Sequence, residues 1–171
     1  MNPLRWSFRL QFFLGFLACV ALVGYAIWTQ FHYGLEPCNL CIFQRVAFAG
    51  LALVFLLGAI HGPRAAGGRR TYGVLGLLAA SVGIYIAGRH VWIQSLPADL
   101  VPSCGPPLSF MSESLGWMQT IQKVLTATGS CGTIDWTFLG LAMPAWSLIC
   151  FIVLALWALY AGFRGRNQKR Y

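Results

Sequence analysis

The sequence contains very few charged residues. They make up only 9% of the 171 residues, and only four of them are acidic, whereas 58% of the chain is hydrophobic. The mean hydropathy is +0.67. A water-soluble globule of this size needs a more polar surface, so the composition indicates an integral membrane protein. The chain also lacks the alternating segments of about ten residues that build a membrane β-barrel, and its spans are therefore expected to be helical.

Four apolar segments are long enough to cross a hydrocarbon core of about 30 Å at about 1.5 Å per residue. They cover approximately residues 10–28, 42–60, 72–93 and 145–163. The first segment exceeds the apolar run of a signal peptide and is followed by no small-residue cleavage site, so we expect it to be retained. The predicted fold is all-α, a bundle of four transmembrane helices in one membrane domain that covers residues 1–171.

The positive charges are segregated along the chain. The net charge is +8, but the cations lie in short runs beside the proposed helix ends, so nucleic acid is not an expected partner. Nine cations lie in three places, namely before the first helix, between the second and third helices, and after the fourth: Arg5, Arg9, Arg64, Arg69, Arg70, Arg164, Arg166, Lys169 and Arg170. All four acids occur in the other two connections: Glu36, Asp99, Glu113 and Asp135. Because cationic loops remain in the cytoplasm, both termini are predicted to be cytoplasmic, with outer loops at about 29–41 and 94–144.

The second outer loop is longer than a simple connection requires. Within it, apolar residues recur at helical spacing opposite polar ones: Met111, Leu115, Met118, Ile121 and Leu125. This pattern predicts a short helix that lies flat on the membrane surface. A helix packed on top of the bundle is the alternative.

A close pair of cysteines, Cys38 and Cys41, opens the second helix. Unpaired backbone N–H groups and the helix dipole stabilise a thiolate at such a position. The outer compartment is also the one in which disulfides persist. A C-x-x-C pair can instead be structural, or part of a zinc site with further cysteines, but no metal is expected here; haem attachment is excluded because Ile42 follows Cys41. A span that starts near Ile42 places Gln44 and Arg45 in the outer interface and Cys41 at a depth that a quinone head group can reach.

Polar residues near the outer helix ends are candidates for quinone binding. Arg45 follows Cys41 by one helical turn, where its charge could stabilise a thiolate and a reduced quinone. Arg89, His90 and Gln94 lie at the outer end of the third helix, and His90 and Gln94 share a face from which they could donate hydrogen bonds or a proton. Anchoring in the lipid head groups is the alternative for these side chains.

A second, wider pair of cysteines, Cys104 and Cys131, lies in turn-rich sequence of the long outer loop. This pair could be a structural link across the loop, or it could exchange electrons with the close pair. Cys19 and Cys150 lie in the middle of predicted spans and are expected to be packing residues.

Over nearly its whole length, the chain resembles the bacterial disulfide bond formation protein B (DsbB) family. The resemblance rests on the four helices, Cys104, Cys131 and three segments: Cys38-Asn39-Leu40-Cys41-Ile42-Phe43-Gln44-Arg45, His90-Val91-Trp92-Ile93-Gln94 and Asp135-Trp136-Thr137-Phe138-Leu139-Gly140-Leu141-Ala142-Met143-Pro144-Ala145-Trp146. It implies an inner-membrane thiol:quinone oxidoreductase that reoxidises DsbA, a periplasmic thioredoxin-like oxidase, and reduces ubiquinone or menaquinone.

The resemblance also implies roles for individual residues. Cys104 would form the mixed disulfide with the partner, and Cys131 would exchange with Cys38. Cys41 would meet the quinone, with Arg45 in support and His90 nearby. Two other classes are considered: an enzyme similar to vitamin K epoxide reductase, which we would expect to have its C-x-x-C near the end of a late helix, and a non-enzymatic membrane scaffold with structural disulfides.

Overall fold

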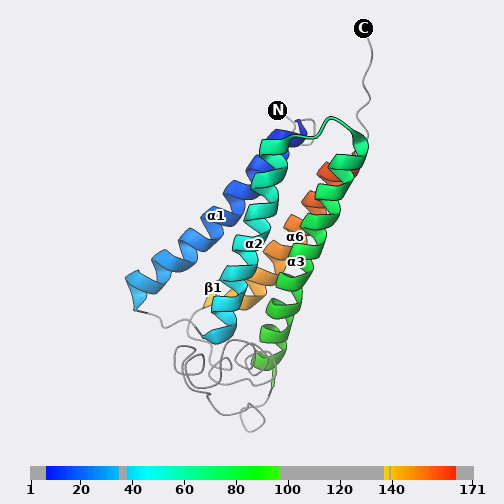
Figure 1. Cartoon of the computed structure of the whole chain (residues 1–171). Helices are drawn as coiled ribbons and strands as arrows, with labels where there is room; N and C mark the ends of the chain where they lie inside the picture. Colours follow the sequence, from blue (N-terminus) through cyan, green and yellow to red (C-terminus); the bar gives the residue numbers. More distant parts are fainter. Residues whose placement is uncertain (1–6, 35–37, 97–136, 139, 165–171) are drawn as a thin grey trace, which may run out of the picture.

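A computed structural model describes residues 7–34, 38–96, 137–138 and 140–164, and within these ranges it is a bundle of long helices (Figure 1). The helices are α1 (Phe8–Tyr33), α2 (Asn39–His61), α3 (Ala66–Gln94) and α6 (Met143–Phe163). All four are long and apolar enough to cross a membrane, which confirms the predicted four-span, all-helical fold. Two short antiparallel strands, β1 (Thr137–Phe138) and β2 (Leu141–Ala142), directly precede α6.

The helices extend beyond the apolar segments from which they were predicted. α1 begins at Phe8 because the Ser7 side chain caps it by accepting a hydrogen bond from the Leu10 N–H, and it continues to Tyr33, before the left-handed Gly34. α3 begins at Ala66 rather than near residue 72, and it ends at Gln94. Hydropathy locates the apolar part of each helix, whereas caps determine where the helix stops. Cys104, Cys131 and the expected interfacial helix at 111–125 lie outside the described residues.

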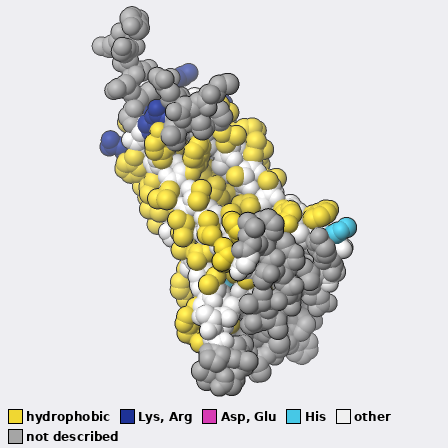
Figure 2. Space-filling model, turned by 180° about the vertical axis from the view of Figure 1, so that it is seen from behind, with side chains coloured by type: hydrophobic (Ala, Val, Ile, Leu, Met, Phe, Trp, Pro, Cys, Tyr) yellow, Lys and Arg dark blue, Asp and Glu magenta, His cyan; other side chains and the backbone are white. Residues whose placement is uncertain are grey.

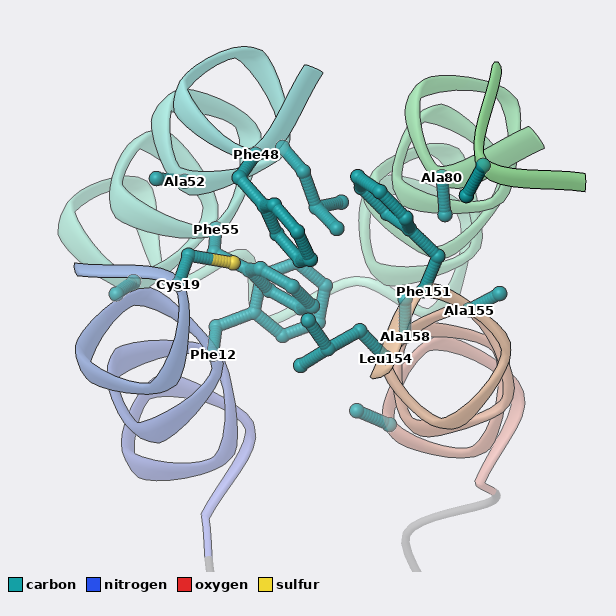
Figure 3. Close-up of a cluster of buried hydrophobic side chains, with 14 residues drawn as sticks. Phe12, Cys19, Phe48, Ala52, Phe55, Ala80, Phe151, Leu154, Ala155 and Ala158 are labelled. Atoms are coloured by element: carbon teal, nitrogen blue, oxygen red, sulfur yellow. The ribbon is translucent and has the colours of Figure 1, made fainter. Parts of the chain in front are cut away.

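Aromatic side chains from three helices form the centre of the bundle (Figure 3). Phe48 of α2 stacks on Phe151 of α6, with ring centroids 3.8 Å apart, and Phe12 of α1 meets Phe55 edge-on at 5.2 Å. Cys19 is fully buried in this cluster. It packs as a small apolar residue, as the sequence predicted.

Small residues allow α3 and α6 to pack with their backbones close together. A stripe on α3 is buried at spacings of three and four residues: Gly73, Gly76, Ala80, Gly83 and Ala87. A Cβ atom added to Gly162 of α6 would lie only 2.8 Å from the Gly73 Cα. Such contacts are typical of helix pairs in membranes, where close backbone approach replaces a hydrophobic driving force. Packing of this stripe fixes the rotation of α3. His90 follows Ala87 by three residues on the same buried face, so its side chain points into the bundle.

The two ends of the bundle differ in charge. One end, the arginine end, is where α1 and α3 begin and α2 and α6 finish, and it contains Arg9, Arg64, Arg69, Arg70 and Arg164. Figure 2 shows basic side chains gathered at this end and a largely hydrophobic surface below them. Arg9 also fastens two helices there, because its Nε donates a hydrogen bond of 3.0 Å to the carbonyl oxygen of Ala59 near the end of α2. At the opposite end, the cysteine end, α2 begins at Asn39, directly after Cys38.

Candidate functional site

Cys38 and Cys41 lie at the start of α2, where the sequence predicted them. Cys38 is the N-cap residue, and its Sγ accepts a hydrogen bond of 3.3 Å from the backbone N–H of Cys41. A Ser, Thr, Asp or Asn oxygen usually holds this position. The two Sγ atoms are 2.8 Å apart, and both residues are half-buried. The start of the helix therefore presents two adjacent thiols, and one of them accepts a hydrogen bond from the backbone.

His90 of α3 lies directly beside this pair. Its side chain is only 2% exposed, and its Nε2 atom is 3.8 Å from Cys38 Sγ. Nε2 and the two Sγ atoms all lie within 4.8 Å of one another. The structure thus brings His90, one of the polar residues predicted on α3, to the cysteines. An imidazole at this distance can exchange a proton with a thiol after a small movement.

Gln44 completes the cluster. The sequence placed it at the level of the outer interface and did not predict that it is buried in the bundle, at 5% exposure, with its Nε2 atom 3.0 Å from His90 Nδ1. The rotation of α2 explains the difference, because Leu40, Gln44 and Phe48 all belong to its buried face. The sequence did contain a signal for this position, because Gln44 follows Cys41 by three residues and so lies on the same side of the helix. The orientation of the Gln44 amide selects the tautomer of His90. With the amide nitrogen facing Nδ1, as here, Nδ1 accepts and the ring proton is on Nε2; with the amide oxygen facing it, Nδ1–H donates and the Nε2 lone pair is free.

Arg45 connects α2 to α1. Its Nη1 donates a hydrogen bond of 2.6 Å to Gln30 Oε1, and its Nη2 donates one of 3.0 Å to the carbonyl oxygen of Ala26. The residue follows Cys41 by one turn, but its guanidinium group reaches the last part of α1. It therefore links α2 to the last turns of α1 and places a positive charge at the cysteine end.

The remaining predicted residues divide into two groups. Arg89 and Gln94 are half-buried in the last turns of α3, and Gln94 lies one turn beyond His90. Cys104 and Cys131 lie outside the described residues. The described site therefore consists of Cys38, Cys41, His90 and Gln44, with Arg45 at its edge.

Comparison with known proteins identifies the family of the chain. The family described as disulfide bond formation protein DsbB matches residues 8–161. The chain belongs to the DsbB family.

Full-length relatives of this DsbB-family chain carry the same description. It is 64% identical over 170 residues to disulfide bond formation protein B of Xanthomonas campestris pv. campestris, with 99% of each chain covered. It is 66% identical over 169 residues to that of Xanthomonas euvesicatoria pv. vesicatoria, covering 99% of this chain and 98% of the relative. The identity to disulfide bond formation protein B of Xylella fastidiosa is 51% over 169 residues, with the same coverage. DsbB membership implies a disulfide-forming oxidoreductase, and the four spans make this chain a multi-pass membrane protein.

Proposed function

We propose that the protein is a thiol:quinone oxidoreductase that reoxidises a DsbA-like periplasmic oxidase. The net reaction transfers two electrons and two protons from a partner dithiol to ubiquinone or menaquinone, so that a disulfide and a quinol form. The observation that best supports this proposal is the pair of adjacent thiols at the start of a membrane helix, beside a buried imidazole.

The electrons would move through two cysteine pairs. A partner thiolate attacks Cys104 of the oxidised Cys104–Cys131 pair, and the resulting mixed disulfide is resolved to give the oxidised partner. The reduced Cys104–Cys131 pair is reoxidised by exchange between Cys131 and Cys38. Cys38 and Cys41 are then left as thiols, and they regain their bond by passing two electrons and two protons to the quinone.

The described residues have distinct proposed roles. Cys41 contacts the quinone, while His90 accepts the proton of Cys38 and returns it as the quinone is reduced. Gln44 positions His90 through its Nδ1 atom. Arg45 stabilises negative charge that develops at the cysteine end. Arg89 and Gln94, on the last turns of α3, are proposed to border the quinone.

The proposed location is the bacterial inner membrane, with the cysteine end facing the periplasm. The support comes from the arginine end, because cationic segments are retained in the cytoplasm. The cysteines would then lie in an oxidising compartment. The driving force must come from the quinone, since about 30 mV of potential difference corresponds to about 1.4 kcal/mol for a two-electron couple.

Quinone consumption by the purified protein tests this function. With a reduced dithiol partner and a soluble quinone, the wild-type protein should reduce quinone over many turnovers, and Cys41→Ser should abolish the reaction. Cys150→Ser, the matched control in the membrane core, should retain it. A wild-type protein without quinone-dependent oxidation, or an active Cys41→Ser variant, would overturn the proposal and favour a scaffold with structural disulfides.

The same assay tests Arg45. Arg45→Leu should raise the quinone concentration needed for half-maximal rate, while thiol exchange with the partner continues. Unchanged quinone kinetics would restrict Arg45 to its structural link with α1.

A further inference from the structure

We propose that Cys38, Cys41 and His90 also form a binding site for one zinc-like transition-metal ion, and that only the reduced thiol pair binds it. Two thiolates and one imidazole are a common ligand set for zinc, and a site with three protein ligands leaves a fourth position for water. The three ligand atoms already lie within 4.8 Å of one another, on two different helices. The inference concerns metal binding and does not depend on the quinone reaction.

The geometry needs only a small adjustment. Bonds of about 2.3 Å to sulfur and about 2.0 Å to nitrogen in a tetrahedral site separate a sulfur from a nitrogen by roughly 3.5 Å and two sulfurs by roughly 3.8 Å. Cys38 Sγ and His90 Nε2 are 3.8 Å apart, close to that separation. The two Sγ atoms, at 2.8 Å, would have to move apart by about 1 Å. Both cysteines are half-buried, so an ion can approach them from the cysteine end.

Gln44 provides the supporting contact that such a site requires. A histidine that binds metal through one ring nitrogen usually donates its other N–H to a neighbouring oxygen, which fixes the ring and its tautomer. The Gln44 amide nitrogen lies 3.0 Å from His90 Nδ1, in a position shielded from solvent, so a half-turn of the amide group brings its oxygen to Nδ1. With the amide oxygen turned toward Nδ1–H, the Nε2 lone pair faces the two sulfurs.

Metal binding and disulfide formation exclude each other at this site. Binding displaces one proton from each thiol, and both sulfurs are then occupied by metal bonds. The oxidised pair has no thiolate to offer. If the proposed function holds, zinc should therefore inhibit reoxidation of the Cys38–Cys41 pair, and a chelator should reverse the inhibition.

Cobalt absorbance measures binding without any quinone. Cobalt(II) is the probe because its bonds to thiolates give charge-transfer bands. The full-length protein with Cys104→Ser and Cys131→Ser, reduced and freed of reductant, should bind one cobalt ion per chain. The thiolate bands should disappear on addition of zinc, which such sites bind more tightly than cobalt. The same protein with a Cys38–Cys41 disulfide should show no bands.

Substitutions then identify the ligands. Cys38→Ser should lower the charge-transfer intensity per bound ion, and Gln44→Ala should weaken binding by about 10- to 100-fold. In the same background, His90→Ala should weaken it further, whereas His61→Ala, the matched change at the arginine end, should leave it unchanged. Circular dichroism of each variant establishes that it is folded. The absence of thiolate bands in the parent protein, equal affinities for His90→Ala and His61→Ala in folded proteins, or full intensity in Cys38→Ser would each overturn the site.

Discussion

The two ends of the bundle are built from different interactions. At the arginine end, Gly73 and Gly162 bring two backbones into contact, and Arg9 binds carbonyl oxygens at the end of α2. At the cysteine end, the contacts between α2 and α3 join sulfur, imidazole and amide groups. One end is thus fastened by packing and backbone contacts, while the other places reactive groups in contact. The comparison shows how a rigid helix pair can position a reactive site many turns away, because the α3 stripe that packs on α6 also directs His90 inward.

The two ends of α2 differ in the same way, because one end has only a structural role and the other contains a reactive group. Gly62 ends the helix in the left-handed conformation, with φ of 52°. Cys38 caps the start with a sulfur that the proposed reaction uses. The cap is therefore also a reactant. A disulfide at Cys38 would therefore use the same sulfur that accepts the Cys41 N–H.

The largest expected difference between the two ends is their accessibility from outside the cell. In a background without native cysteines, Ser95→Cys at the cysteine end of α3 should be labelled by an impermeant maleimide in intact spheroplasts. Gly67→Cys at the other end of the same helix should be labelled only after permeabilisation, because the arginine end is predicted to face the cytoplasm. Labelling of Gly67→Cys from outside would reverse the topology and remove the cysteines from the oxidising compartment.

A methyl group at the α3–α6 contact should affect stability strongly. Gly162→Ala places Cβ 2.8 Å from the Gly73 Cα and 2.9 Å from the Arg69 carbonyl oxygen, so backbone atoms must shift. We expect it to lower the free energy of unfolding by about 1–3 kcal/mol. Unfolding in mixed detergent and SDS micelles, followed by circular dichroism, measures the change.

The matched substitution lies on α2. Gly50→Ala adds the same methyl group where nothing lies within 4 Å, and it should be neutral or stabilising by up to about 1 kcal/mol. Equal effects of the two substitutions would show that close packing does not hold the arginine end.

The smallest expected effect separates the helix-capping role of Cys38 from its proposed redox role. Cys38→Ser and Cys38→Ala both remove the thiol, so neither variant should reduce quinone. Serine retains an atom that can accept the Cys41 N–H hydrogen bond, whereas alanine does not. Cys38→Ser should therefore be more stable than Cys38→Ala by about 0.5–1 kcal/mol in the same unfolding measurement. Indistinguishable stabilities would mean that the contact of Cys38 Sγ with the backbone contributes nothing to the start of α2.

The sequence was sufficient to predict the four spans and the position of Cys38 and Cys41, because both depend on local features, namely apolar length and helix start. It was not sufficient to place Gln44. Glutamine near a helix end is usually solvated, and its burial depends on a partner 46 residues away on another helix. The direction of the Arg45 side chain was also unpredictable, since helical spacing locates its Cα on a face but does not identify α1 as its neighbour. Rotation of one helix against another is a tertiary property that single-chain periodicity does not contain.

A single turnover tests most directly whether the thiol pair at the start of α2 transfers electrons to quinone. The protein with Cys104→Ser and Cys131→Ser is reduced, freed of reductant and mixed with excess quinone. Quinol formation is then followed by absorbance, and remaining thiols are counted by alkylation and mass spectrometry. The account predicts one quinol per chain, with simultaneous loss of the Cys38 and Cys41 thiols and with Cys19 and Cys150 unchanged. No quinol, or quinol formation that leaves Cys38 and Cys41 reduced, would contradict it.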